Sequence, residues 1–275
     1  MNGAPGPAGP RRWRPAACAA VLLGGLALLG PMLAPYPPDA QDLMRVMEPP
    51  SASHWLGTDL VGRDVLARVL AGAPHSLGLA LVCVVLAAAT GMTLGMVAAN
   101  AGPTLRTAIL RLADLMLACP GLLLALLFAG FLGGGIWPML IGLKLSLWPH
   151  YARMAEAIAT GALRENHVEA ARLAAFPERT ILVRHVLPPV LRGVMPLATL
   201  GAGQAIMSIS ALGFLGLGLK PPTPEWGAMI NELMPFLAEG FVQVAAPCAM
   251  IVLSVLVLAV AGRSMGGSSD AREHG

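Results

Sequence analysis

Few side chains in this sequence have the type and spacing that chemistry requires, and the most unusual of them is a lysine. Lys144 follows Trp137 by about two helical turns within an apolar stretch. If that stretch spans a membrane, the ammonium group costs on the order of 3 kcal/mol at the bilayer centre and has to face protein or water. Two interpretations stay open: Lys144 lines a pore and attracts the carboxylate of a solute, or its side chain extends toward the outer headgroups.

Other candidate groups do not form a catalytic or metal-binding set. The six histidines include no pair with metal-ligand spacing on one helix, and the four cysteines form no CxxC pair. Ser208, Ser210 and Ser254 have no histidine within the same apolar stretches, so an intramembrane serine protease is not indicated. Arg111 and Asp114 are spaced for an ion pair on one helix, which we interpret as a structural anchor. We therefore expect no catalytic, cofactor-binding or metal-binding residue on this chain.

The amino-acid composition indicates a membrane protein. Of the 275 residues, 56% are hydrophobic and 12% are charged, whereas soluble domains contain about 25% charged residues. The mean hydropathy is +0.70. No water-soluble fold of this length hides so much apolar surface, so the solvent must be lipid. The net charge of +3 is small, and we expect the lipid bilayer but no nucleic acid among the partners.

Six apolar stretches are long enough to cross a bilayer, which takes about 20 helical residues. The predicted spans are Ala16–Ala34, Ser76–Ala99, Leu112–Leu132, Trp137–Ile158, Val194–Leu219 and Phe241–Ala261. Glycine and proline within them do not argue against helices, because neighbouring helices can satisfy the freed backbone groups. The expected fold class is an all-α integral membrane protein with six transmembrane helices.

The positions of arginine and lysine predict the orientation, because cytoplasmic segments carry an excess of both. With the N-terminus inside, thirteen of the 18 basic residues lie on the inner face and four on the outer face. Both termini are therefore expected in the cytoplasm. Arg11, Arg12 and Arg14 before the first stretch also resemble a signal peptide, but no A-x-A cleavage site follows, and we favour an uncleaved span.

These predictions divide the chain into five parts. They are a cytoplasmic leader (1–15), a first transmembrane helix (16–34), an outer segment (35–75), a five-helix membrane core with a cytoplasmic loop at 160–193 (76–262), and a cytoplasmic tail (263–275). A second outer segment, Lys220–Gly240, is stiffened by prolines, and its Trp226 is of the type that favours the membrane interface.

The loop at 160–193 is long for a connection between two membrane spans and contains the pattern of an amphipathic helix. Glu165–Phe176 reads as a short amphipathic helix, and Pro177 prevents its simple continuation. Val168, Ala171 and Ala175 line one face, where small side chains would let a partner approach closely. From composition alone, a solvated basic loop that obeys the positive-inside rule is an equal alternative.

Two motifs in this loop resemble the EAA loop of ATP-binding-cassette importer permeases. They are Glu169-Ala170-Ala171 and, sixteen residues after Glu169, His185-Val186-Leu187-Pro188. In that family the helix of this loop docks in a groove of the ATPase subunit. The resemblance implies that the residues that couple to the ATPase are Glu169, Ala170, Ala171, Ala175, Leu187 and Pro188. The family has a glycine at the position of Ala175, so the usual turn after the helix is in question here.

Further motifs are similar to those of the dipeptide, oligopeptide and nickel importer permeases. They are His54-Trp55-Leu56-Gly57-Thr58-Asp59 with Gly62-Arg63-Asp64, Asp114 with Pro120, Trp148-Pro149-His150-Tyr151-Ala152-Arg153, and Pro222-Thr223-Pro224-Glu225-Trp226-Gly227. The resemblance covers residues 51–262. Within that family the chain looks like the second, shorter permease subunit of a heterodimer.

The resemblance implies an ATP-driven, binding-protein-dependent importer in the bacterial plasma (inner) membrane. Its partners would be a second homologous permease subunit, two ATPase subunits that bind ATP and Mg, and an external substrate-binding protein. The solute would be a peptide or a related small solute such as nickel or a metallophore complex. This chain has no GxxxxGK[ST] loop, so it is not expected to be an enzyme. The alternative is an ion-coupled secondary transporter, which would need coupling carboxylates or internally related halves that the sequence does not show.

Overall fold

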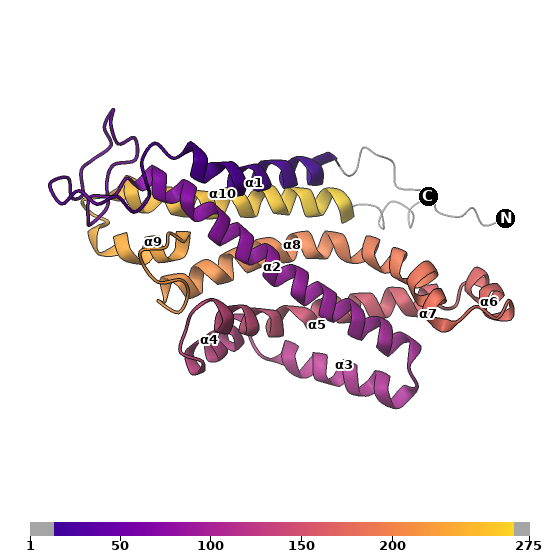
Figure 1. Cartoon of the computed structure of the whole chain (residues 1–275). Coiled ribbons are helices and arrows are strands. Elements are labelled where there is room, and N and C mark those ends of the chain that lie inside the picture. The colour runs from indigo at the N-terminus through magenta and orange to yellow at the C-terminus, as the bar shows by residue number, and fades with distance from the viewer. Residues whose placement is uncertain (1–13, 267–275) are drawn as a thin grey trace, which may run out of the picture.

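The computed structural model describes residues 14–266 as a bundle of helices (Figure 1). Among these residues no strand forms, and the only β-type pairing is an isolated bridge between Thr58 and Asp64. The all-α prediction is therefore confirmed. Residues 1–13 and 267–275, which include most of the predicted leader and tail, lie outside the described residues.

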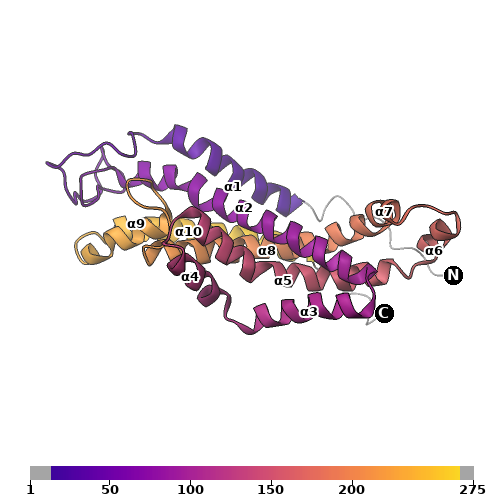
Figure 2. The same ribbon diagram turned by 60° about the horizontal axis from the view of Figure 1, so that its bottom comes forward.

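The described residues form the following helices, in the order of the chain. They are α1 (Arg14–Leu33), α2 (Val65–Asn100), α3 (Pro103–Ala118), α4 (Gly121–Phe131), α5 (Ile136–Ala162), α6 (Asn166–Leu173), α7 (Glu178–Ile181), a π-helical turn (Leu182–Val186), α8 (Leu187–Phe214), α9 (Trp226–Leu233), a 3-10 turn (Met234–Phe236) and α10 (Phe241–Gly266). Figures 1 and 2 show α6 and α7 projecting from one end of the bundle, here called the α6 end. The opposite end, called the α9 end, carries α9 and residues 34–64.

Within the described residues, four helices are long and apolar enough to cross a membrane. They are Pro15–Leu33, Val65–Asn100, Glu178–Phe214 and Phe241–Met265, and a fifth span results if α3 and α4 count as one broken span. The third predicted span, Leu112–Leu132, is wrong as a single helix because α3 and α4 meet at 87°. The break follows from Pro120, which biases the preceding residue away from helical backbone angles; Cys119 is extended, with ψ 132°.

The starts of two other predicted spans are also corrected. α2 begins at Val65 and not at Ser76, because the Asp64 carboxylate caps it by accepting a hydrogen bond of 2.7 Å from the Ala67 amide. α8 begins at Leu187 and not at Val194, since the two prolines that follow Leu187 fall in its first turn, where proline is tolerated. An apolar stretch marks where a helix meets lipid, whereas capping decides where it begins.

α2 and α5 form the centre of the bundle and approach each other through glycine. A Cβ atom at Gly91 of α2 would lie 2.5 Å from the Trp148 carbonyl oxygen and 2.6 Å from Tyr151 Cβ of α5. Small residues allow this approach between membrane helices. The surrounding core is built mainly from alanine, leucine and valine, with Trp148 and Tyr151 almost fully buried.

Candidate functional site

The helix α6 packs against its own chain through the face that sequence had suggested for a partner. Val168 and Ala171 are buried and form a small cluster with Ile181 of α7, against which Leu163 packs. The expectation that this face is free for a partner is therefore wrong. Pro177, which caps α7, turns the chain so that α7 covers the inward face of α6.

The turn that follows α6 has the geometry usually built with glycine, although the residue is alanine. Ala175 has φ +55°, in the left-handed region that disfavours side chains. The Phe176 amide donates to the Ala171 carbonyl at 3.1 Å and the Ala175 amide donates to the Arg172 carbonyl at 2.9 Å. These two bonds make a Schellman motif, so α6 ends at Leu173 and does not continue to Phe176 as expected.

The outward surface of this loop combines charge with exposed apolar side chains. Glu169 and Ala170 are exposed. Leu173 is 85% exposed, Phe176 50% and Val183 56%. Arg172 donates to Glu178 at 3.0 Å, which joins α6 to α7 on this surface. An apolar group ringed by ion pairs is typical of a protein contact surface.

The predicted coupling residues therefore divide into four groups. Glu169 and Ala170 lie on the exposed surface, Ala171 lies beneath it, and Ala175 forms the turn. Leu187 and Pro188 are half-buried and begin α8. The π-helical turn makes Glu178–Phe214 one continuous helical stretch. The loop is thus joined to a long apolar helix without an extended linker.

Two ion pairs connect α3 and α5 near the α6 end. Arg106 contacts Glu156 with an Nη2–Oε1 distance of 2.6 Å, and Glu156 also accepts a hydrogen bond from Thr160. Asp114 pairs with Arg153 of α5, so the expected helical pair with Arg111 is replaced by one between helices. Pairs separated by this much sequence leave no local signal, so the sequence does not predict that Asp114 pairs with Arg153 or Arg106 with Glu156.

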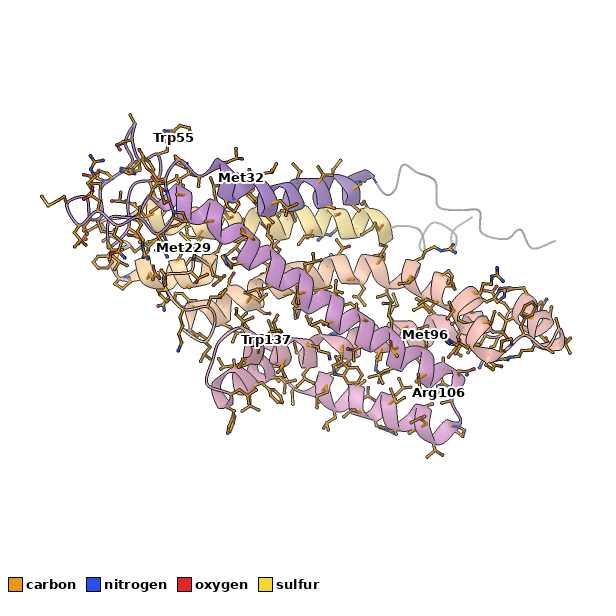
Figure 3. The ribbon with its side chains drawn as sticks, viewed as in Figure 1. Met32, Trp55, Met96, Arg106, Trp137 and Met229 are labelled. Carbon is orange, nitrogen blue, oxygen red and sulfur yellow. The ribbon has the colours of Figure 1, made fainter. Side chains whose placement is uncertain are left out.

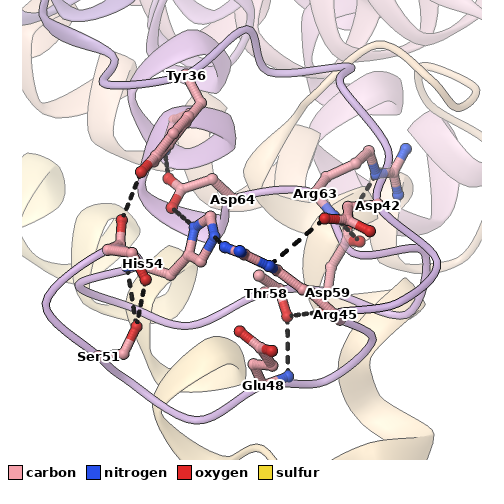
Figure 4. A network of polar contacts seen from close by, with 12 residues as sticks. Tyr36, Asp42, Arg45, Glu48, Ser51, His54, Thr58, Asp59, Arg63 and Asp64 are labelled. Carbon is pink, nitrogen blue, oxygen red and sulfur yellow. Dashed lines mark hydrogen bonds and ion pairs between the residues drawn. The ribbon is translucent and has the colours of Figure 1, made fainter.

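At the α9 end, buried charges join residues 34–64 to α2 and α9, and Figure 4 shows two of them, Asp59 and Arg63. Asp59 Oδ2 accepts hydrogen bonds from Arg63 Nε at 2.6 Å and Arg68 Nη1 at 3.1 Å. Glu232 Oε2 of α9 accepts from the same two arginines at 3.0 and 3.2 Å. Burial raises the pKa of Glu232, which Arg63 lowers and Asp59 raises further. Two positive and two negative groups balance, as burial requires.

A second polar group at this end surrounds a histidine (Figure 4). His54 Nδ1 lies 2.8 Å from Asp64 Oδ2, and its Nε2 lies 3.4 Å from Arg45 Nη1. The Tyr36 ring stacks on His54 with centroids 4.9 Å apart. The other oxygen of Asp64 caps α2. The motif from His54 to Asp64 therefore forms a hydrogen-bonded network that joins the segment 34–64 to the start of α2. The residue types of the motif do not by themselves predict this structural role.

Another buried carboxylate, Glu225, has no ion pair with a cationic side chain among residues 14–266. Glu225 caps α9 by accepting hydrogen bonds from the Gly227 and Ala228 amides, both at 2.9 Å. The hydroxyls of Ser76 and Ser210 lie 3.2 and 3.5 Å from its Oε1. Burial raises the pKa of Glu225, although these four donors act in the opposite direction.

The tryptophans correct an expectation about the interface. Trp226 is fully buried, and its indole N–H donates to the Val69 carbonyl at 2.9 Å. It belongs to the core and not to the membrane interface. Instead Trp55 and Trp137 are exposed, and Figure 3 shows Trp55 in the segment 34–64 and Trp137 near the start of α5.

Lys144 is half-buried on α5. It shares a helical face with Trp148 and Tyr151, which follow it by four and seven residues. Among the residues that the structure describes, no ion pair involves Lys144. The same residues contain no group of three or more potential metal ligands.

The all-helical bundle, its apolar spans and the loop that joins directly to α8 define a transport domain embedded in a membrane. Residues 91–272 match the family described as "Binding-protein-dependent transport system inner membrane component". The chain belongs to that family.

Curated relatives are similar over nearly the whole chain. The nickel transport system permease protein NikC of Escherichia coli K12 is 33% identical and covers 89% of this chain and 88% of its own length. The di/tripeptide transport system permease protein DppC of Pseudomonas aeruginosa UCBPP-PA14 is 37% identical, over 89% of this chain and 82% of its own. The glutathione transport system permease protein GsiD of Escherichia coli O6:K15:H31 is 34% identical, over 94% and 86%.

Among solved structures, a chain of the MetNI methionine ABC transporter in an inward-facing conformation has the same fold. Its TM-score is 0.57 at 18% identity, over 72% of this chain and 94% of that chain. These findings confirm the expected class: the chain is a permease subunit of an ABC importer in the inner membrane.

Proposed function

We propose that this chain forms the transmembrane pathway of an ATP-driven importer together with a second homologous permease subunit. Two ATPase subunits bind ATP and Mg on one side of the membrane, and a substrate-binding protein delivers the solute on the other. The solute is a peptide or a related small solute such as nickel or a metallophore complex. The nickel, di/tripeptide and glutathione names of the relatives support this range.

The proposed topology has six spans with both termini in the cytoplasm. The spans are α1, α2, the bent pair α3–α4, α5, α8 and α10. α5 supplies the sixth, because its 27 residues are long enough to cross the hydrocarbon. The α6 end then faces the cytoplasm and the α9 end faces outward, which follows the arginine distribution in the sequence.

The observation that carries the coupling role is the packing of α6 on α7, which continues directly into α8. Ile181 locks α7 onto Val168 of α6, and Glu178–Phe214 continues as one helical stretch. A displacement of α6 by a docked ATPase would therefore reach α8 as a rigid-body movement. Glu169, Ala170 and Leu173 form the proposed contact surface, and Ala171 supports it from beneath. Ala175 forms the turn after it, and Leu187 and Pro188 begin the helix that would receive the movement.

The sharpest test compares charge reversals at the two ends of the bundle. Glu169→Arg changes the proposed docking surface, and Glu239→Arg is the matched control because Glu239 is also exposed but lies between α9 and α10. Each variant is purified in mild detergent with the chains that accompany it. We expect the wild type to recover a second permease and an ATPase, Glu169→Arg to lose the ATPase alone, and Glu239→Arg to keep both.

Recovery of the wild type alone or as a homo-oligomer would favour the ion-coupled secondary transporter instead. Uptake then separates the two classes. An ABC importer stops when ATP is depleted and continues when the proton gradient collapses, whereas a secondary transporter responds in the opposite way.

For Lys144 we propose a pore role in which its ammonium group attracts a solute carboxylate. The absence of an ion pair to Lys144 among the described residues supports it. Lys144→Met should reduce uptake of anionic solute, and Lys144→Arg should retain it. Unchanged uptake rate and selectivity in Lys144→Met would leave Lys144 as a lysine that only extends toward the headgroups.

A further inference from the structure

Two polar side chains, His150 of α5 and Gln204 of α8, are exposed in the middle of apolar helices. Among the described residues neither side chain makes a hydrogen bond or an ion pair. Thr199 on α8, by contrast, donates its hydroxyl to the Met195 carbonyl at 3.0 Å. His150 and Gln204 thus have hydrogen-bonding groups that the described part of this chain does not use.

α5 and α8 run antiparallel in a constant register, which places these two residues close to one level. Three contacts join the helices along their length: Gly135 to Leu217, Tyr151 to Gly201, and Ile158 to Gly193. Between successive contacts α5 advances by 16 and 7 residues, while α8 goes back by 16 and 8. His150 therefore lies level with Ala202, which is two residues, or about 3 Å along the axis, from Gln204.

Both side chains lie on the side of α5 and α8 that faces away from α2, which crosses the two helices (Figure 1). On α5, Ala152 faces α2, since a Cβ atom at Gly91 of α2 would lie 2.9 Å from its amide nitrogen. On α8, Ala202 lines an apolar groove shared with α1 and α2. His150 and Gln204 are each two residues from these alanines, about 200° around the helix. They therefore share one face, here called the open face.

The break between α3 and α4 lies at the same level of the bundle. α4 begins beside Ser146 of α5, because a Cβ atom at Gly121 would lie 3.3 Å from Ser146 Cβ. α3 meets α5 where Asp114 pairs with Arg153. His150 lies between these two positions of α5. α4 has no side-chain cap, so its first amides have no partner within the helix. Broken helices at mid-membrane are a common place for solute binding in transporters.

In the proposed topology this level is the middle of the membrane. Gln204 lies ten residues, or about 15 Å, after Val194, where the apolar stretch begins, and equally far before Phe214, where α8 ends. Leu200 and Met207, its neighbours on the open face, are 42% and 51% exposed. An amide exposed to hydrocarbon would keep its donors and acceptor unpaired, which is strongly unfavourable. The open face should therefore meet water or polar groups and not acyl chains.

We propose that His150 and Gln204 bind the solute at the middle of the transport pathway by recognising the main chain of a peptide. This inference rests on the proposed function, in which this chain lines the pathway. A glutamine amide both donates and accepts hydrogen bonds, as does a neutral imidazole, so the pair complements the N–H and C=O groups of a peptide. A bare metal ion fits less well, because the described residues contain no group of three or more potential metal ligands.

The first experiment measures uptake of labelled dialanine and of labelled nickel ion by cells that express the whole importer. Gln204→Leu and His150→Phe remove the hydrogen-bonding groups, and Met207→Leu is the matched control on the open face. We expect wild type and Met207→Leu to import dialanine when ATP is present. Gln204→Leu and His150→Phe should each lower uptake about tenfold at low dialanine concentration, the size of one lost hydrogen bond. Both variants should still copurify with the second permease and the ATPase.

Cysteine labelling separates solute contact from a structural role. The four native cysteines are first replaced with serine. In the assembled importer, Gln204→Cys and His150→Cys should then react with a charged thiol reagent, which does not partition into lipid, and dialanine should slow both reactions. Leu256→Cys is the control and should not react, because Leu256 is 55% exposed on α10 where the other large exposed side chains of that helix are also apolar.

Unchanged dialanine uptake in both Gln204→Leu and His150→Phe would overturn the inference, as would import of nickel ion but not of dialanine by the wild type. Labelling that dialanine does not slow would overturn it even where uptake is too slow to measure. It would also fail if Gln204→Leu lost the second permease, since Gln204 would then join the two permeases. These results leave ATP-driven import intact, whereas wild-type uptake that continues without ATP would contradict the proposed function itself.

Discussion

Ser76 of α2 donates a hydrogen bond of 3.2 Å to the carboxylate of Glu225, 149 residues later in the chain. Ser210 of α8 lies 3.5 Å from the same oxygen, which also accepts the Gly227 amide at the start of α9. One carboxylate thus holds three helices together at the α9 end. Among the described residues no cationic side chain pairs with this buried carboxylate, so its stabilisation depends on these hydrogen-bond donors.

Replacing Glu225 with alanine should weaken the fold. The change removes the cap of α9 and leaves buried donors unpaired, so the free energy of unfolding should fall by about 2 kcal/mol. The measurement is a denaturant titration of the detergent-solubilised chain. Glu239→Ala, at an exposed position after α9, should change it by less than about 0.5 kcal/mol. If both variants lowered the free energy of unfolding by the same amount, the hydrogen bonds of Glu225 would contribute no more to stability than an exposed glutamate does.

The raised pKa of Glu225 predicts a pH dependence of stability with a definite sign. Because burial raises this pKa, the folded chain binds the proton more tightly than the unfolded chain does. The contribution is fully present below the ordinary pKa of a glutamate, about 4.3, and is lost as the pH rises through the raised pKa. Relative to Glu225→Gln, the wild type should lose stability as the pH rises above about 4, and unfolding curves recorded at a series of pH values would show this loss. A wild type that gains stability with pH would contradict this.

The buried ion pairs of Arg68 should be worth far more than the exposed pair of Arg45. Arg68→Met leaves Asp59 and Glu232 with one arginine between them and should cost about 3 kcal/mol. Asp42→Asn, which breaks the exposed 3.5 Å pair with Arg45, should cost less than about 0.5 kcal/mol.

A second substitution tests whether charge imbalance is the cause of that loss. Arg68→Met combined with Asp59→Asn restores one positive and one negative group, Arg63 with Glu232. Thermal unfolding should place the double variant above Arg68→Met. A double variant that is less stable than Arg68→Met would mean that Asp59 acts through its other hydrogen bonds.

Ala175→Gly should stabilise the loop that carries α6. The φ of +55° costs a side chain about 1 kcal/mol, and glycine removes that cost. Hydrogen exchange of the α6 amides measures the gain as slower local opening. Ala174→Gly is the control, since Ala174 has φ −78° and glycine there brings only added flexibility to the unfolded chain. Faster exchange in Ala175→Gly would count against the strained turn.

Gly91→Ala should separate α2 from α5. The added methyl group would meet the Trp148 carbonyl and Tyr151 Cβ at 2.5 and 2.6 Å, so the helices must move apart at a cost of about 2 kcal/mol. Gly161→Ala, in open space near the end of α5, should be neutral or stabilising by up to about 1 kcal/mol. The melting temperatures of both variants in detergent test this contrast, and a stable Gly91→Ala would show that the interface adapts.

Predictions from the sequence succeeded where neighbouring residues in the chain determine the structure. They failed where a contact with a residue distant in the chain determines it. Long apolar stretches located α1, α2, α8 and α10, because lipid imposes the same requirement along the whole span. The bend between α3 and α4 was missed, although Pro120 was visible, since a proline can either kink a membrane helix or break it. The inward face of α6 was assigned to a partner because nothing near it in sequence indicated that Ile181 covers it.

The sequence by itself determined the membrane class, the apolar spans and the family, because composition and short motifs are carried by neighbouring residues. Only the tertiary structure decided that Trp226 is buried, that Arg63 reaches Glu232 across 169 residues, and that Asp114 pairs with Arg153. The physical reason is that burial and charge pairing depend on which helix faces meet, and helix crossings and loop paths bring together residues that no pattern in the chain connects.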